Sequence, residues 1–141
     1  MKLISIVVPC YNEQEVFDET YKRLTETFEH LDKSKYTYEI IFVNDGSKDN
    51  TIDLIQKVIS SDSRVKGINF SRNFGHQIAI TAGLDNCKGD AAVVIDADLQ
   101  DPPSLMVDFI QKWESGFKIV VGIKGETEEG GIMYYARKAY Y

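Results

Sequence analysis

The chain has 141 residues, which is the size of one ordinary domain and allows a single substantial hydrophobic core. Its 43% hydrophobic content, with only ten glycines and three prolines, excludes a disordered or fibrous protein. Aspartate and glutamate outnumber lysine and arginine by 22 to 16, so a broad nucleic-acid-binding surface is not expected, and an anionic ligand would need a local cation.

The first residues are apolar but do not form a targeting signal. Pro9 interrupts the apolar run of residues 1–8 and polar residues follow too soon for a signal peptide, so this run is predicted to be a strand. No apolar run is long enough to cross a bilayer, and we expect the chain as given to be soluble. Cys10 and Cys87 are too few for a disulfide framework and are interpreted as buried structural thiols in a reducing compartment.

Short β-branched runs alternate along the chain with stretches of helical spacing. This alternation predicts an α/β domain with a mostly parallel sheet and helices on its faces. The first strand is expected at residues 3–8, and the next helix should begin at Asn12, an N-cap with Glu15 in the capping-box position. The buried face of this helix repeats at intervals of three and four residues: Phe17, Tyr21, Leu24, Phe28 and Leu31.

Further strands and helices follow in the same alternation. The strands are expected at residues 38–43, 65–70, 91–95 and 118–121. The helices are expected around residues 52–59, at 77–86 with Gly89 ending it in a left-handed conformation, and from Pro102 with Gly116 past its end. The strand at 91–95 is almost wholly apolar, so we expect it at the centre of the sheet, covered on both faces.

The character of the sequence changes after Gly122. Residues 124–131 are charged and glycine-rich without an apolar period, and one short stretch of helical spacing follows at 132–141. We therefore divide the chain into a ligand-binding core, residues 1–122, and a region of residues 123–141 that consists of a flexible acidic loop and a terminal helix.

Three of the predicted strands end in polar and acidic sequence. These endings are Pro9 to Glu13, Asn44 to Ser47 and Asp96 to Asp101. In an open parallel sheet the ligand crevice lies beyond the carboxyl ends of the strands, where the strand order reverses. We therefore expect the three segments to converge on one rim and to form the ligand site there.

Asp96, Asp98 and Gln100 are the candidate metal ligands. Residues two apart in an extended segment point the same way, so these three side chains would face one site. Hard oxygen ligands suit Mg²⁺ or Mn²⁺, and so few protein ligands leave positions open for phosphate oxygens. The cation would stabilise charge on a departing nucleoside diphosphate, which gives Asp96 and Asp98 a catalytic role. The alternative is that both aspartates only cap the following helix.

Asp45 and Tyr11 are the candidate nucleoside-binding residues. Gly46 permits a tight turn after the strand, and an ionised Asp45 would accept the imide N–H of uracil or the N–H groups of guanine. Tyr11 would lie flat against the base, with Pro9 shaping the wall and Glu13 reaching the ribose hydroxyls. The structural alternatives are an Asx-turn at Asp45 and ordinary loop packing of Tyr11.

Arg72 and His76 lie in the loop expected after the third strand. Both side chains are candidates for contacts with the base or the phosphates. The alternative for His76 is a structural role. His30 falls within the first predicted helix and is interpreted as a surface residue.

Taken together, these segments resemble the catalytic domain of family 2 glycosyltransferases with the GT-A fold. The matching segments are residues 7–13, 42–51 and 94–103; they occur in the family's order and reach from the first strand to the fourth helix. Residues 71–76 and 99–103 further resemble the branch that includes dolichol-phosphate mannose synthase and the bacterial polyprenyl-phosphate glucosyltransferases.

The resemblance implies an inverting transfer of a sugar from a UDP- or GDP-linked donor to a lipid phosphate, with Mg²⁺ or Mn²⁺ as cofactor. It also implies a full-length protein on the cytoplasmic face of the membrane, held there by a C-terminal region and compatible with a homo-oligomer. By position, Pro9, Tyr11, Glu13 and Asp45 would hold the nucleoside, Asp96, Asp98 and Gln100 would hold the metal and diphosphate, and Arg72 and Ala97 complete the expected nucleotide-sugar site.

The sequence departs from this branch after the fifth strand. The branch carries basic residues around an acceptor loop there, whereas residues 125–131 are acidic and glycine-rich. The chain stops at Tyr141, before the acceptor-side portion and the membrane helices, so we expect a truncated piece that binds a donor and transfers little. Residues 134–141 would suit a membrane-surface helix, or a cut-off helix that packs against missing structure.

Three other classes of protein share part of this sequence pattern. A non-catalytic nucleotide-sugar-binding module differs from the enzyme only in the missing C-terminal part. A phospho-acceptor receiver domain would use Lys124, but it expects an acidic pair directly after the first strand, where this chain has Pro9 to Glu13. No G-x-G-x-x-G follows the first strand, which argues against a dinucleotide oxidoreductase.

Overall fold

The computed structural model describes residues 1–98, 102–124 and 132–137. The chain divides into two compact units, Met1–Pro103 and Ser104–Tyr141. The division falls earlier than the boundary after Gly122 that the composition indicated, because the helix and strand that follow Pro103 contact each other.

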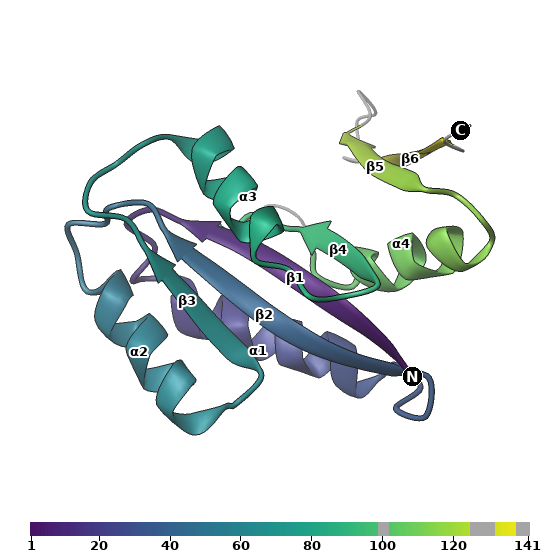
Figure 1. The fold of residues 1–141 in the computed structure, drawn as a ribbon, viewed down its shortest axis with the longest axis horizontal. Helices are drawn as coiled ribbons and strands as arrows, with labels where there is room; N and C mark the ends of the chain where they lie inside the picture. Colours follow the sequence, from purple (N-terminus) through teal and green to yellow (C-terminus); the bar gives the residue numbers. More distant parts are fainter. Residues whose placement is uncertain (99–101, 125–131, 138–141) are drawn as a thin grey trace. The chain divides into compact units, whose positions relative to one another are not determined.

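The first unit is built on four parallel strands, as the alternation of segments predicted. They are β1 (Lys2–Cys10), β2 (Tyr36–Asn44), β3 (Val65–Asn69) and β4 (Ala91–Val94), in the order β3-β2-β1-β4. The chain runs from β1 outward to β3 and then returns to place β4 on the other side of β1 (Figure 1). The strand order therefore reverses at β1, and a ligand crevice is expected at the carboxyl ends of β1 and β4.

Helices cover both faces of this sheet, as expected. They are α1 (Phe17–Glu29), α2 (Thr51–Ser61) and α3 (His76–Asp85). Phe17 of α1 stacks on Phe42 with ring centroids 4.8 Å apart, whereas Ala79 of α3 packs with Ile41 on the opposite face. Neighbouring residues of a strand point to opposite faces, so β2 contributes to two separate cores. In Figure 1, α3 lies in front of β1 and β2, and α1 lies behind them.

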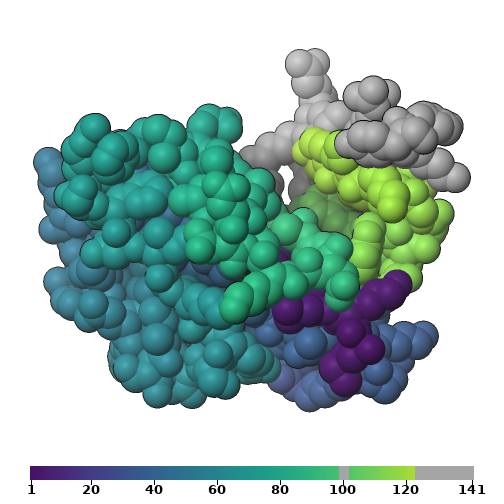
Figure 2. All heavy atoms as spheres, viewed as in Figure 1, coloured from purple at the N-terminus to yellow at the C-terminus, as the bar shows by residue number. Residues whose placement is uncertain are grey.

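The contact between α3 and the sheet is unusually close because Gly83 faces β1. A Cβ atom at Gly83 would lie 2.3 Å from Cγ1 of Val7, a distance that side chains do not tolerate. This packing covers the sheet on the α3 side, and the dark purple of β1 emerges at only one edge of that face in Figure 2. The carboxyl end of β1 is therefore held against a firmly seated helix.

The start of α1 differs from the prediction. The helix begins at Phe17 rather than near Asn12, and Val16 at the N-cap position makes no side-chain capping bond, so the predicted capping box is wrong. Asn12 instead has a left-handed φ of 52° and its side chain bonds to the loop after β2. Competition from this long-range bond explains the error, since asparagine side chains serve turns as readily as helix caps.

The position of β4 and the role of Gly89 also differ from expectation. Among the described residues β4 lies at the edge of the sheet, and Val94 is 37% exposed, so the predicted central position is wrong there. Apolar sequence reveals neither whether a strand has two neighbours nor whether both of its faces are covered. Gly89 does not have a positive φ; it is needed because a Cβ would lie 2.6 Å from Oγ of Ser5.

The second unit contains α4 (Leu105–Glu114), β5 (Ile119–Lys124) and β6 (Ile132–Arg137). β5 and β6 form an antiparallel pair, so the terminal helix expected in residues 132–141 is wrong for residues 132–137, and the rest of it lies outside the described residues. The segment contains an isoleucine and two tyrosines, which favour strands, and pairing with β5 outweighs its short helical spacing. Gly116 ends α4 with a φ of 105°, as predicted. Within the described ranges no helix has the length and apolarity needed to cross a bilayer.

Asp62 anchors the start of β3 to α1. Its carboxylate accepts hydrogen bonds from the Tyr21 hydroxyl at 2.7 Å and from Nε and Nη2 of Arg64 at 2.9 and 3.0 Å. These bonds, led by those from Arg64, lower the pKa of Asp62 to about 2. The carboxylate therefore joins α1 to the turn that follows α2.

The pKa of Asp62 predicts how acid weakens the fold. Because the pKa is lowered from 3.8, the contribution of Asp62 to the free energy of unfolding is complete above about pH 5 and is lost as the pH falls towards 2. We expect Asp62→Asn to lower the free energy of unfolding by roughly 1–3 kcal/mol at pH 7 and by much less at low pH, measured by urea unfolding. The exposed Asp53→Asn on α2 is the control, and an equal loss for Asp62→Asn at both pH values would contradict this prediction.

Candidate functional site

The loops that follow β1, β2 and β3 are hydrogen-bonded to one another. The backbone N–H of Asn12 donates to Oγ of Ser47 at 2.9 Å, and the N–H of Lys48 donates to Oδ1 of Asn12 at 2.8 Å. Nδ2 of Asn44 donates to Oδ1 of Asn69 at 2.8 Å, at the ends of β2 and β3. Two of the three segments predicted to form the rim, those after β1 and β2, are therefore joined by hydrogen bonds.

The segment after β4 is fixed by its central residue, Ala97. The side chain of Ala97 is buried, and its carbonyl oxygen accepts a hydrogen bond at 2.8 Å from the hydroxyl of Thr20, which is itself buried in α1. The preceding Ile95 donates its N–H to the carbonyl of Val7 at 3.0 Å. With Ala97 held inward, Asp96 and Asp98 on either side of it reach the cavity.

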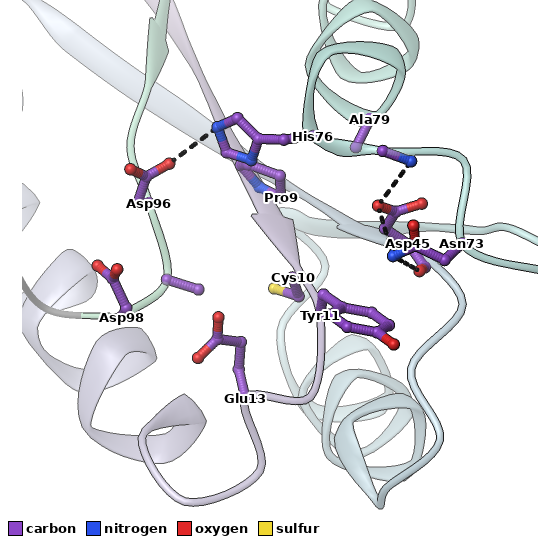
Figure 3. Close-up of a pocket in the computed structure, with 12 residues that line it drawn as sticks. Pro9, Cys10, Tyr11, Glu13, Asp45, Asn73, His76, Ala79, Asp96 and Asp98 are labelled. Carbon is purple, nitrogen blue, oxygen red and sulfur yellow. Dashed lines mark hydrogen bonds and ion pairs between the residues drawn. The ribbon is translucent and has the colours of Figure 1, made fainter.

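A cavity of about 360 Å³ lies at the carboxyl ends of β1, β2 and β4 (Figure 3). In Figure 3, Asp96 and Asp98 approach from the segment after β4, Asp45 lies across the cavity beside α3, and Tyr11 and Glu13 come from the loop after β1. The lining residues are Pro9, Cys10, Tyr11, Glu13, Asp45, Asn73, Gly75, His76, Ala79, Asp96, Ala97 and Asp98.

The cavity is strongly acidic. Four of its lining residues are carboxylic acids, and none of the described lining residues is a lysine or an arginine. Burial raises the pKa of Glu13, and repulsion from Asp98, Asp49 and Asp96 raises it further. Burial and the nearby Glu13 also raise the pKa of the Cys10 thiol, which leaves it protonated and inert, as expected of a structural cysteine. These carboxylates would repel an anion unless a positive charge offset theirs.

Asp45 is buried, and its carboxylate accepts hydrogen bonds from the segment after β3. Oδ1 accepts the N–H of Phe74 at 2.7 Å, and Oδ2 accepts the N–H of Gly75 and Nδ2 of Asn73, each at 3.2 Å. A carboxylate offers about four acceptor positions, so these three bonds from described residues fill all but about one of them. The side chain thus reaches across to the next loop, and in the part of the chain that the structure describes it does not form the Asx-turn considered as the alternative.

His76 is the first residue of α3, and its imidazole lies beside Asp96. Nε2 of His76 is 3.3 Å from Oδ1 of Asp96 (Figure 3). The contact joins the start of α3 to the end of β4. His76 therefore belongs to the acidic side of the cavity, next to an expected metal ligand.

Most of the residues expected to bind nucleotide sugar lie together. The cavity is lined by Pro9, Tyr11, Glu13, Asp45, Asp96, Ala97 and Asp98. Arg72 is not among the lining residues; its guanidinium carbon stacks 4.0 Å above the ring of Phe74. Gln100 lies outside the described residues. Binding of a nucleotide sugar by any of these side chains remains a prediction.

Sequence reasoning missed Thr20 and Asn73. Thr20 interrupts the apolar face of α1, but it lies three residues after Phe17 and four before Leu24, so its helical spacing alone indicated a core position. Asn73 had no such signal, because its role depends on a hydrogen bond to a residue 28 positions earlier. Thr20 and Asn73 are hydrogen-bonded to residues of the site, although neither belongs to the strand endings from which the site was predicted.

The donor set suits a divalent cation held with help from a substrate. Asp96 and Asp98 offer hard carboxylate oxygens in one cavity, the ligand type of Mg²⁺ and Mn²⁺. In the part of the chain that the structure describes, no group of three or more His, Cys, Asp or Glu side chains is arranged to hold a metal by itself. One or two carboxylates completed by phosphate oxygens is a common arrangement for Mg²⁺.

Comparison with known proteins gives a consistent result. Residues 5–139 match the family model described as Glycosyl transferase family 2. The chain is 53% identical to an uncharacterized glycosyltransferase, YkcC, of Bacillus subtilis, covering 93% of this chain and 42% of that protein. It is 43% identical to a prophage bactoprenol glucosyl transferase homolog of Escherichia coli, covering 91% of this chain and 41% of that protein. The chain thus spans about two fifths of the length of these relatives.

Solved structures share the fold at low sequence identity. The structure of S. aureus TarS residues 1–349 in complex with UDP matches with a TM-score of 0.60 and 21% identity, over 82% of this chain and 33% of that one. The mannosyltransferase PcManGT from Pyrobaculum calidifontis, in complex with GDP-Man and Mn²⁺, matches with a TM-score of 0.58 and 21% identity, over 72% and 33%. These matches confirm the expected GT-A architecture with its mostly parallel sheet.

Proposed function

Because the chain belongs to glycosyltransferase family 2, we propose that it is the donor-binding part of an enzyme that transfers a sugar from a nucleoside diphosphate to an acceptor with inversion. The observation that carries the proposal is a cavity with four carboxylic acids and, among its described lining residues, no lysine or arginine. A diphosphate is strongly anionic and would be repelled unless a divalent cation accompanied it. Asp96 and Asp98 are the side chains suited to hold that cation.

Each side of the cavity has a role in this proposal. Tyr11, 42% exposed at the mouth, would stack on the base, and the remaining acceptor position of Asp45 would bind a base N–H. Glu13 would accept the ribose hydroxyls. When bound, Mg²⁺ or Mn²⁺ would act as a Lewis acid that stabilises negative charge on the departing diphosphate. Asp96 and Asp98 would orient the diphosphate by fixing the cation between it and the protein.

We further propose a lipid phosphate as the acceptor. The support is the name bactoprenol glucosyl transferase among the relatives at 42–43% identity. An oxygen of the acceptor phosphate would form the new bond to the anomeric carbon, while the bond from that carbon to the diphosphate breaks and its electron pair leaves with the nucleoside diphosphate. Since a lipid phosphate is already ionised near neutral pH, the step needs no strong general base. The whole protein would then work at a membrane surface, in cell-envelope glycan synthesis.

Nucleotide binding tests this proposal directly. We expect UDP or GDP to bind the chain in calorimetry at least about tenfold more tightly with Mn²⁺ than with a chelator, because the cation offsets repulsion from the carboxylates. UMP or GMP, which lacks the second phosphate, is the control and should gain little from Mn²⁺. If no uridine or guanosine nucleotide binds under either condition, the proposed function is wrong; if the diphosphates bind equally well with the chelator, the metal site is wrong.

A further inference from the structure

The short segment from Asn73 to His76 lies between the two sides of the cavity. At one end, the carboxylate of Asp45 accepts the backbone N–H groups of Phe74 and Gly75 at 2.7 and 3.2 Å. At the other end, Nε2 of His76 lies 3.3 Å from Oδ1 of Asp96. One continuous piece of backbone therefore joins the carboxylate assigned to the base with a carboxylate assigned to the cation.

The backbone of this segment is fixed as well as its ends. Gly75 has a φ of 104° and a ψ of 157°, a conformation that is essentially restricted to glycine, and it directly precedes α3. From there α3 is seated on the sheet by the fully buried Ala79 and by the close approach of Gly83 to Val7. His76 thus extends from a helix that has little freedom to shift relative to the strands.

Asp96 needs such a partner because its surroundings are acidic. Asp96 is one of the three carboxylates that raise the pKa of Glu13, and Asp98 follows it after one buried residue. Without a donor, the Asp96 carboxylate would turn away from its neighbours towards solvent, since like charges repel. The imidazole nitrogen 3.3 Å from Oδ1 restrains one side of the carboxylate and leaves the other oxygen for a cation.

We propose that His76 is a positioning residue that orients Asp96 for the cation, and that Asp45 sets the place of His76 by holding the N–H groups of Phe74 and Gly75. This proposal deepens the proposed function and rests on it. It gives Asp45 a second task beside base recognition, so that the nucleoside and diphosphate ends of the cavity are coupled through residues 73–76. His76 itself touches neither base nor phosphate in this arrangement.

Two variants of His76 separate positioning from bulk or charge. Glutamine places an amide N–H close to where imidazole Nε2 lies, whereas leucine fills similar space without a donor. We expect His76→Leu to reduce the tightening of UDP or GDP binding by Mn²⁺ about tenfold in calorimetry, and His76→Gln to recover most of it. Because the His76 side chain is 56% exposed, both variants should keep the thermal midpoint of the native chain, which shows that the fold is intact.

Nuclear magnetic resonance tests the coupling without any ligand. The chain has only two histidines, so the ¹⁵N signals of His30, which directly follows α1 and does not line the cavity, serve as an internal control. At one fixed pH, Asp96→Asn should shift the imidazole signals of His76 and leave those of His30 in place. Asp45→Asn, which removes a charged acceptor from the loop, should shift the His76 signals as well.

The outcomes separate the two proposals. The positioning role would be overturned if both His76→Leu and His76→Gln bound UDP or GDP with Mn²⁺ like the native chain. It would also be overturned if His76→Leu bound more tightly. Unchanged His76 signals in Asp45→Asn would overturn the coupling. If the native chain binds no nucleotide with Mn²⁺, the proposed function fails, and the magnetic resonance result still decides whether Asp45 and Asp96 fix His76.

Discussion

Replacing Asp98 with asparagine is expected to weaken the binding of UDP or GDP in the presence of Mn²⁺ by about 10- to 100-fold, which corresponds to roughly 1.4–2.7 kcal/mol. Asparagine keeps one oxygen but loses the charge, and a hard divalent cation prefers an anionic oxygen ligand. Asp98 is exposed on the cavity wall, so the substitution should leave the core intact. Calorimetry with and without Mn²⁺, on the native and variant chains, measures the effect.

The matched control for this variant is Asp85→Asn. Asp85 is an exposed aspartate at the end of α3, in the same unit, and does not line the cavity. Its substitution by asparagine therefore removes the same charge without changing the site. Equal losses in the two variants would mean that only the overall charge matters. If the affinity does not depend on Mn²⁺ and is unchanged in Asp98→Asn, the proposal that Asp96 and Asp98 bind a cation is wrong.

The convergence of the acidic segments could be predicted from the sequence because parallel strands place their carboxyl ends at one edge. Strand endings at Glu13, Asp45 and Asp96 were recognisable from local pattern alone, and all three residues line the cavity. Strand and helix types follow from residue periodicity, which is also a local property. The strands and helices of the first unit could be predicted for the same reason.

What could not be predicted depends on contacts between distant residues. The side chain of Asn12 had two competing uses, and only the nearby Lys48 of the folded chain decided between them. The bonds that Asp45 accepts from residues 73–75 leave no trace in local pattern, so only base recognition or a local Asx-turn was foreseen. Residues 132–137 form a strand because β5 is available as a partner, which a six-residue pattern cannot reveal.

Gly46 lies in close contact with the loop after β3, and its substitution should have a large effect on folding. A Cβ atom at Gly46 would lie 2.3 Å from the carbonyl carbon of Arg72 and 2.4 Å from the N atom of Asn73. Both are backbone atoms that cannot turn aside as a side-chain end would. The residue also has a φ of 71°, in the left-handed region that costs other residues free energy.

We expect Gly46→Ala to lower the free energy of unfolding by on the order of 3 kcal/mol, as backbone strain and displacement of the facing loop combine. Gly75→Ala is the comparison, because Gly75 also has a positive φ but a Cβ there would have no neighbour within 4 Å. Urea unfolding of Gly75→Ala therefore reports backbone strain alone, whereas the loss at Gly46 also includes displacement of the facing loop. Since the displaced Asn73 is bonded to Asp45, nucleotide affinity should fall with stability at Gly46. A Gly46→Ala variant as stable as the native chain would mean that the loop moves aside freely, and the anchoring of residues 73–76 by Asp45 would then be too weak to orient His76.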